Sequence, residues 1–233
     1  MKQRITIFAL TLIVGATVAA FAGEPRVLTA TVPAANVDVV RLDAGVGDVE
    51  IIGADVAEVS LEVKLEPRRG GFFSSLKTAQ REVDTAQLRT EVKKGALTLK
   101  IDTDSDDHRF EEHWVIELPT RLAFDLKLGV GDVEVRGLTG DLDLDLGVGD
   151  LVAEGISGNV IVELGVGDAT LIGAADHYGS VDGSGGVGDT RLTVRGKRIL
   201  SSGFVGHSAE WKGDGPNTVE ISVGVGDARV TLE

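Results

Sequence analysis

The sequence of 233 residues contains no cysteine. Disulfide bonds are therefore excluded, and a well-paired β ladder would have to hold an exported fold together. A bacterial lipoprotein is also disfavoured, because such proteins carry their lipid on a cysteine and this sequence has none. The nucleophile motif Gly-x-Ser-x-Gly is also absent, so no motif supports a catalytic triad.

Long apolar runs are absent beyond residue 22. Before that point, Lys2 and Arg4 precede an uncharged apolar run over residues 5–20, and Ala20-Phe21-Ala22 fits the small-x-small cleavage pattern. Residues 1–22 therefore read as a secretory signal peptide, with an uncleaved membrane anchor as the alternative. The mature chain would begin at Gly23, would be periplasmic or secreted, and would have no integral membrane segment.

Basic residues are few: 23 Lys and Arg stand against 37 Asp and Glu, a net charge of −14. Loss of Lys2 and Arg4 with the signal peptide would leave 21 basic residues against the same 37 acidic ones, a net charge of −16. Nucleic acid and anionic lipid are therefore poor partners for the surface as a whole. Metal cations and basic partner surfaces are compatible with it, and solubility alone also explains it.

Glycine, by contrast, is abundant, with 31 residues against an ordinary share of about 7%. The tetrapeptide Gly-Val-Gly-Asp supplies 12 of them in six copies, with start-to-start spacings of 84, 18, 18, 21 and 38 residues. The last spacing is about twice the unit, and Phe204-Val205-Gly206-His207 reads as a degenerate seventh copy midway. The bend residues are Gly45, Gly47, Asp48, Gly129, Gly131, Asp132, Gly147, Gly149, Asp150, Gly165, Gly167, Asp168, Gly186, Gly188, Asp189, Gly224, Gly226 and Asp227.

Apolar residues alternate with polar ones on both sides of each tetrapeptide. Leu142, Leu144 and Leu146 alternate with aspartates, and Leu151 and Ala153 follow the bend. A period of two is typical of a strand with one buried face. Each unit therefore predicts a strand, a Gly-Val-Gly-Asp bend, a second strand and a second turn.

The tetrapeptide has a complete structural explanation without a ligand. Glycine adopts positive φ and lets backbones approach closely. The valine would stay in the core, and the aspartate would accept a hydrogen bond from an N–H group of its own bend. We therefore assign the bend residues as structural turn residues.

Two all-β architectures fit the repeat. In a β-solenoid each unit stacks on the next about 4.8 Å away; in an antiparallel meander each unit is a hairpin. The regular unit length favours the solenoid. It would place Leu128, Leu146 and Leu164 in one internal ladder, and Val130, Val148 and Val166 in another. Its corner would carry a column of aspartates, Asp132, Asp150, Asp168, Asp189 and Asp227, with His207 between the last two.

The repeat is interrupted over residues 53–125. Leu76, Ala79, Val83 and Ala86 are spaced like one helical face, which predicts a short helix or an ordered loop within an irregular insertion at about residues 66–95. No shift in composition marks a second domain, so residues 23–233 are expected to form a single β-strand-repeat domain.

Residues 114–150, "WVIELPTRLAFDLKLGVGDVEVRGLTGDLDLDLGVGD", resemble a known bacterial family. This is the β-strand-repeat domain labelled "putative adhesin", whose members show Gly-Ser-Gly-Asp units on a similar period. The resemblance extends more weakly over residues 36–233, and Val130, Val148 and Val166 replace the usual serine. It implies a right-handed β-helix-like solenoid at the cell envelope or surface, and it carries over no catalytic residue.

Four sets of residues are candidate chemical sites. Aspartates of the bend column (Asp132, Asp150, Asp168, Asp189, Asp227) are weak candidates for calcium, which needs six to eight oxygen ligands. Asp102-Thr103-Asp104-Ser105-Asp106 opens like an EF-hand loop, but Asp107 and His113 occupy its glycine and glutamate positions. His108 and His113 are conceivable zinc ligands. Lys127, Asp145 and Glu163 would form an outward column like the catalytic face of pectin-cleaving β-helices, or a charge-balanced solvent face.

The sequence leads to three functional hypotheses. The first is a non-enzymatic exported β-solenoid that binds an envelope protein or a cell-wall component, with no cofactor and no nucleic acid partner. The second is a structural module that binds divalent cations. The third is a polysaccharide-acting β-helix enzyme. A melt with a chelator separates the second from the first, and activity on acidic polysaccharides would favour the third.

Overall fold

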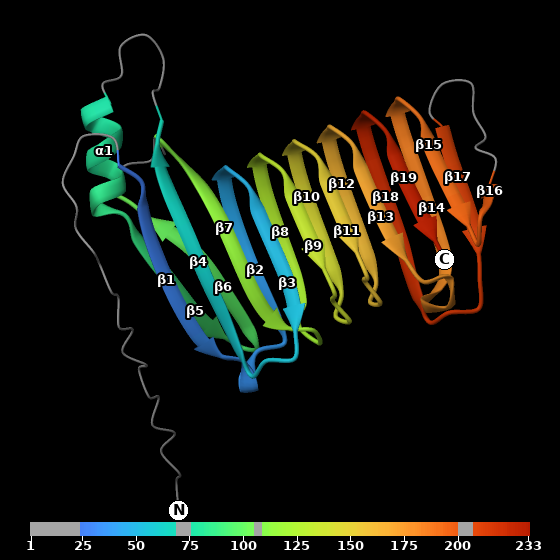
Figure 1. Cartoon of the computed structure of the whole chain (residues 1–233), viewed down its shortest axis with the longest axis horizontal. Coiled ribbons are helices and arrows are strands. Elements are labelled where there is room, and N and C mark those ends of the chain that lie inside the picture. Colours follow the sequence, from blue (N-terminus) through green and yellow to red (C-terminus); the bar gives the residue numbers. More distant parts are fainter. Residues whose placement is uncertain (1–23, 69–75, 105–108, 200–206) are drawn as a thin grey trace, which may run out of the picture.

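The computed structural model describes residues 24–68, 76–104, 109–199 and 207–233. It is an all-β structure with two mixed sheets, neither of which closes on itself, and one α-helix at the end that carries the first strand (Figure 1). The expected signal peptide, His108 and most of the degenerate repeat copy lie outside the described residues. Among the described residues, no helix is both long enough and apolar enough to span a membrane.

The two sheets contain all the strands of the described chain. In spatial order the first sheet comprises β1 (Arg26–Pro33), β4 (Glu58–Pro67), β7 (Phe110–Pro119), β3 (Val49–Ala54), β9 (Val133–Arg136), β11 (Leu151–Glu154), β13 (Ala169–Gly173), β19 (Ala228–Leu232), β15 (Thr190–Val194) and β16 (Lys197–Ile199). The second comprises β17 (His207–Lys212), β14 (Tyr178–Val187), β18 (Asn217–Val225), β12 (Val160–Val166), β10 (Leu142–Val148), β8 (Ala123–Val130), β2 (Val39–Val46), β6 (Ala96–Asp102) and β5 (Gln87–Lys93). The helices are α1 (Leu76–Thr85) and the 3₁₀ turns η1 (Ala34–Asn36) and η2 (Ala175–His177).

Each repeat unit contributes one strand to each sheet, and neighbouring units pair in parallel. Strand β10 pairs with β8 on one side and β12 on the other, which sets Leu146 beside Leu128 and Leu164. All three leucines are buried, so the predicted leucine ladder is confirmed. Antiparallel pairs occur at the ends of the sheets, where β1, β4 and β7 pair in succession and β5 pairs with β6.

The spatial order of the units differs from their order in the sequence. The last unit, β18 and β19, lies between β12–β13 and β14–β15. The expectation that His207 separates the last two aspartates is therefore wrong: the backbone of His207 pairs with Gly185 in the antiparallel β14–β17 ladder. Strands β16 and β17 pair with the outer edges of β15 and β14, which protects those edges from pairing with other chains. The opposite edges of β15 and β14 pair with β19 and β18 of the last unit.

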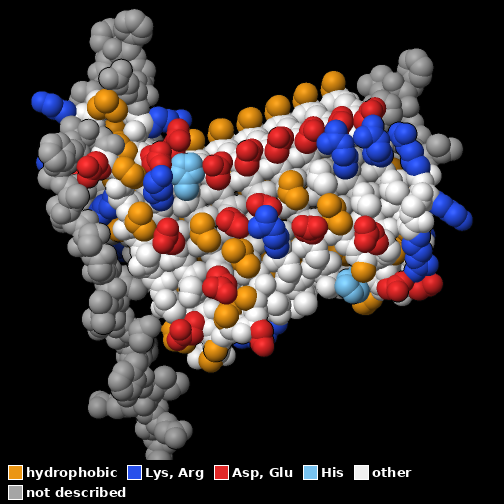
Figure 2. Space-filling model, in the orientation of Figure 1, with side chains coloured by type: hydrophobic (Ala, Val, Ile, Leu, Met, Phe, Trp, Pro, Cys, Tyr) orange, Lys and Arg blue, Asp and Glu red, His pale blue; other side chains and the backbone are white. Residues whose placement is uncertain are grey.

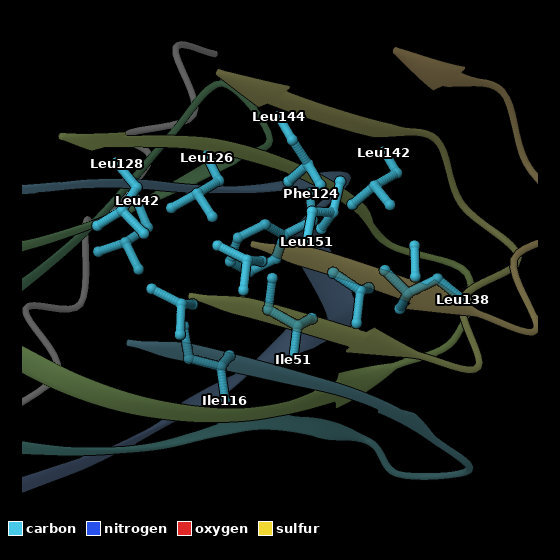
Figure 3. Close-up of a cluster of buried hydrophobic side chains, with 14 of the residues drawn as sticks. Leu42, Ile51, Ile116, Phe124, Leu126, Leu128, Leu138, Leu142, Leu144 and Leu151 are labelled. Carbon is cyan, nitrogen blue, oxygen red and sulfur yellow. The ribbon is translucent and has the colours of Figure 1, made fainter. Parts of the chain in front are cut away.

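The two sheets enclose one apolar core. Phe124, Leu126 and Leu144 of the second sheet face Ile51 and Ile116 of the first sheet (Figure 3). The in-facing residues of the repeats follow the period of two that the sequence shows. Burial of this alternating set is the main source of stability in a chain without disulfides.

The valines of the tetrapeptide do not belong to this core. Val130, Val148 and Val166 are 46–47% exposed to solvent, so the prediction that they form an internal ladder is wrong. Alternation points Val148 to the same side as Leu146, but the buried layer ends at Leu146 and resumes at Leu151 after the bend. The valines therefore lie beyond the edge of the core.

The insertion at about residues 66–95 contains helix α1 and strand β5. Ala79, Val83 and Ala86 are buried as the helical spacing predicts, whereas Leu76 is 39% exposed. The guanidinium of Arg26 donates to the carbonyls of Val83, Asp84 and Ala86 at 2.8–2.9 Å. These bonds satisfy carbonyl groups at the helix C-terminus and fix α1 at the end of the sheets.

Candidate functional site

The second glycine of each tetrapeptide is required by its backbone conformation and by its neighbour. These glycines have φ between 136° and 148°, a region that side chains with a Cβ rarely adopt. A Cβ on Gly149 would also lie 1.9 Å from the carbonyl oxygen of Gly131 in the adjacent unit. The bends can therefore stack this closely only because the position that faces the neighbouring carbonyl is glycine.

The aspartates of the bends form a hydrogen-bonded ladder. The N–H of Asp150 donates to Oδ1 of Asp132 at 2.9 Å, and the N–H of Asp168 donates to Oδ1 of Asp150 at 2.8 Å. In spatial order the ladder is Asp48, Asp132, Asp150, Asp168, Asp227 and Asp189. The expected bond within one bend is thus replaced by a bond between neighbouring bends, because stacking brings the next N–H group to the carboxylate.

The second carboxylate oxygens have different partners along the ladder. At one end Asp48 lies 3.2 Å from Nδ1 of His113. Toward the other end Arg229 donates to Oδ2 of Asp168 at 3.0 Å and also pairs with Asp227, and Arg191 donates to Oδ2 of Asp189 at 3.3 Å. The hydrogen bond from the N–H of Asp227, together with Arg229, lowers the pKa of Asp168 below its ordinary value.

The middle of the ladder is not neutralised. Within the described chain, the Oδ2 atoms of Asp132 and Asp150 have no hydrogen-bond or ion-pair partner. Figure 2 shows this row of acidic side chains crossing one face, with a histidine at one end and basic side chains at the other. The free oxygens mark the part of the ladder that is open to an external cation.

The valines of the tetrapeptides form an apolar row, which we call the valine ridge; all are exposed except Val46, which is half-buried. Its members in spatial order are Val46, Val130, Val148, Val166, Val225 and Val187, each directly opposite the next across a parallel strand pair. Val187 is the most exposed, at 66%. Figure 2 shows the ridge as a row of hydrophobic side chains along the upper edge, beside the aspartates. With about 4.8 Å between strands, the ridge is roughly 24 Å long.

A shallow hollow of about 460 Å³ lies on the second sheet beside the ridge. Its lining includes the glycines Gly147, Gly165 and Gly224, which have no side chain to fill the space, and the carboxylates of Asp145 and Glu163. Asp145 is directly opposite Lys127 and Glu163 on the neighbouring strands, and its Oδ2 atom lies 3.9 Å from Nζ of Lys127. The expected column of these three residues is therefore present.

The other candidate metal ligands are dispersed or engaged. In the described ranges, no group of three or more His, Asp or Glu side chains is arranged to hold a metal ion. Four of the five candidate aspartates accept a backbone N–H through Oδ1, and Asp189 pairs with Arg191 through Oδ2. Of the five Oδ2 atoms, only those of Asp132 and Asp150 have no partner among the described residues. His113 contacts Asp48, and Asp102 pairs with Arg89. Residues 105–107 of the EF-hand-like stretch lie outside the described residues.

One buried titratable group is not among the predicted site residues. Glu112 is only 4% exposed, and Nε1 of Trp114 donates to its Oε2 atom at 2.9 Å. Burial raises the pKa of Glu112 to about 7, with a further contribution from the like charge of Asp43. The alternation of Phe110, Glu112 and Trp114 already indicated that Glu112 points into the core.

Comparison with known proteins yields similar structures only. No protein-family model and no curated protein sequence matches this chain. A solved structure described as a "putative cell adhesion protein" from Clostridium sporogenes is 20% identical, with a TM-score of 0.61, and the match covers 90% of this chain and 100% of that one. A "putative adhesin" from Bacteroides fragilis is 17% identical, with a TM-score of 0.35 over 88% of this chain and 97% of that one. The likeness to the clostridial protein establishes a shared fold.

Proposed function

We propose that this protein is a non-enzymatic, exported binding module of the cell envelope, built as a β-solenoid and adhesin-like in role. The observation that carries the proposal is the valine ridge, which repeats one valine in register across six strands and exposes it on five of them. Large exposed apolar rows are uncommon on proteins that act alone and are typical of interaction surfaces. The partner would be an envelope protein or a cell-wall component.

Two further observations support this role. The clostridial structure with the same fold is described as a "putative cell adhesion protein". Parallel pairing of successive units also makes the binding surface extend with each repeat, as in other repeat proteins that bind along their length. In the proposal the charged side chains at the bends stabilise the stacking of the units and form part of the binding surface. No residue acts as a nucleophile.

The proposal is tested first by export. The full-length chain is expressed in a bacterium, the periplasm, membrane and medium are separated, and the N-terminus is sequenced. We expect periplasmic or secreted protein that begins at Gly23. Recovery of membrane-embedded protein that retains Met1 contradicts the exported role.

The binding role is tested with the exported chain immobilised on a support. Envelope extract and purified cell wall are passed over it, and retained material is compared with that on a column of the same protein unfolded in urea and blocked. A component retained by the folded protein alone is expected. Retention of nothing from either source contradicts the binding role.

A second candidate function, action on a polysaccharide, is favoured by one feature. Asp145 and Glu163 are adjacent carboxylates in an open hollow, and paired carboxylates cleave glycosidic bonds in many hydrolases. Incubation with acidic polysaccharides, followed by reducing-end analysis, tests it. Cleavage that is lost in Asp145→Asn would replace the binding role with an enzymatic one.

A further inference from the structure

The valine ridge is flanked by carboxylates on both sides. In the bends, on the side toward the first sheet, lie Asp132 and Asp150, whose Oδ2 atoms have no partner in the described chain. On the second sheet Asp145 and Glu163 line the hollow, with Lys127 beside Asp145 as the nearest cation. The ridge is thus an apolar strip between two negatively charged borders.

This arrangement discriminates between the surfaces that could cover it. A second copy would bring its own acidic borders against those of the first, in a chain with a net charge of −14, and like charges in contact oppose association. An anionic membrane surface would be repelled by the same borders. A segment that carries apolar side chains in one row and basic side chains beside it complements both features.

We propose that the valine ridge docks a cationic amphipathic segment of an envelope protein. Apolar side chains of the segment cover Val148, Val166 and their neighbours, while lysine or arginine side chains pair with Asp132 and Asp150. This inference rests on the proposed binding function and names the chemistry of its partner.

The hollow beside the ridge adds a place for a larger side chain. Its glycine floor leaves about 460 Å³ open, and Asp145 and Glu163 line the same space. An arginine or lysine of the segment fits this chemistry, because its methylene groups can lie on the backbone while its charge meets a carboxylate. The segment would therefore contact carboxylates on both sides of the valines.

The probes are three labelled synthetic peptides of about ten residues, long enough when extended to follow the ridge. One alternates leucine and lysine, one leucine and glutamate, and one serine and lysine. Binding to the exported chain is measured by fluorescence anisotropy. We expect the leucine–lysine peptide to bind at least about tenfold more tightly than either of the others, because only it matches both the ridge and its borders.

Two variants locate the contact on the ridge. Val148→Ser with Val166→Ser removes apolar surface, and it should weaken binding of the leucine–lysine peptide about tenfold. The matched control is Val92→Ser with Val115→Ser, at two valines that are 45% and 41% exposed elsewhere; it should bind as the unaltered protein does. If the serine pair reduces thermal stability, Val148→Thr with Val166→Thr keeps the branched shape and tests the same contact.

A third variant tests the acidic border. Asp132→Asn with Asp150→Asn keeps an acceptor oxygen for the ladder but removes two charges, and it should weaken binding about threefold to tenfold and reduce its dependence on salt. The control is Asp55→Asn with Asp214→Asn, at two exposed aspartates that lie outside the bends. Equal losses from this control would overturn the assignment of the charge contact to the border.

Several results would overturn the proposal. They are equal binding by the valine variant, preference for the leucine–glutamate peptide, dimerisation that the valine variant abolishes, or ridge-dependent binding to phosphatidylglycerol vesicles. Failure of the broader binding role is distinguishable. If the folded protein retains an envelope component equally well with and without the valine substitutions, the binding role stands and the ridge proposal falls. If the ridge binds the peptide but nothing is retained from the envelope, the binding role and the envelope partner both fall, and only the affinity of the ridge for cationic amphipathic peptides remains.

Discussion

The backbone N–H of Asp168 donates to the Oδ1 atom of Asp150 at 2.8 Å, and the bond joins two successive bends. The same bond recurs between each pair of neighbouring bends from Asp48 to Asp189. Hydrogen bonding to the ionised carboxylate offsets the repulsion between aspartates one strand apart. The tetrapeptide thus stabilises the stacking of the units, because its aspartate accepts a hydrogen bond from the neighbouring unit.

Substitution of Asp150 separates the hydrogen bond from the charge. Asp150→Asn keeps an acceptor oxygen for the N–H of Asp168 and should change the free energy of unfolding little. Asp150→Ala removes the acceptor and should lower it by about 1 kcal/mol, the net value of one hydrogen bond. Urea unfolding of both variants checks this, and equal losses would show that the charge, not the hydrogen bond, stabilises the bend.

Divalent cations should have little effect on stability. The Oδ1 atoms of the ladder are already occupied by backbone N–H groups, so a calcium ion would find too few free oxygens for its usual six to eight ligands. We expect the melting temperature to be nearly the same in calcium and in EDTA. A large rise in calcium that Asp150→Asn abolishes would convert the ladder into a metal site.

Leu146 and Val148 stand two residues apart on the same strand but should respond differently to truncation. Leu146 is 2% exposed and Val148 is 46% exposed. Leu146→Ala should cost about 2–5 kcal/mol of unfolding free energy, as at other buried leucines. Val148→Ala should stay within about 0.5 kcal/mol, as at surface positions. Denaturant unfolding measures both, and similar losses would place Val148 in the core.

This contrast shows which features of the fold the sequence could predict. The period of two located strands such as β10 and identified Leu146 as buried, because successive side chains of a strand point to opposite faces of the sheet. It could not show that Val148 lies beyond the core, because the depth of the core depends on where the opposite sheet begins. Nor could spacing show that the unit of Gly224 lies beside that of Gly165, since strand order is set by long-range pairing.

The site was predicted in part for the same reason. The column of Lys127, Asp145 and Glu163 follows from the repeat length alone, and the structure contains it. The partner of each aspartate did not follow, because a bond between bends requires the stacking geometry. The burial of Glu112 is not evident from its residue type, because glutamate side chains usually lie at the surface. Its alternation with Phe110 and Trp114 indicates that it points into the core.

The first glycine of the tetrapeptide provides a test of stacking with an internal control. A Cβ on Gly147 would lie 2.4 Å from the carbonyl oxygen of Gly129, whereas a Cβ on Gly45 would have no atom within 4 Å. Gly147→Ala should therefore cost about 1–3 kcal/mol or more, because the adjacent backbone has to move. Gly45→Ala, at the same repeat position, should stay within about 0.5 kcal/mol. Equal melting temperatures for the two variants would contradict close stacking.

The buried carboxyl of Glu112 should make stability depend on pH. Its pKa is about 7 in the folded protein against an ordinary value of 4.5. Between these values the folded state keeps a proton that the unfolded state has lost, so stability falls as pH rises through this window and is level above it. The shift corresponds to about 3 kcal/mol.

Glu112→Gln should abolish this part of the pH dependence. Glutamine cannot ionise, and its amide oxygen can still accept the hydrogen bond from Nε1 of Trp114, which lies 2.9 Å from the carboxylate. The difference in unfolding free energy between the variant and the unaltered protein should therefore grow by about 3 kcal/mol from pH 4.5 to pH 7.5. Glu111→Gln, at the neighbouring and partly exposed position, is the control for removal of one negative charge from this strand. Parallel curves for the unaltered protein and Glu112→Gln would mean that Glu112 is ionised in the folded state at the same pH as in the unfolded chain.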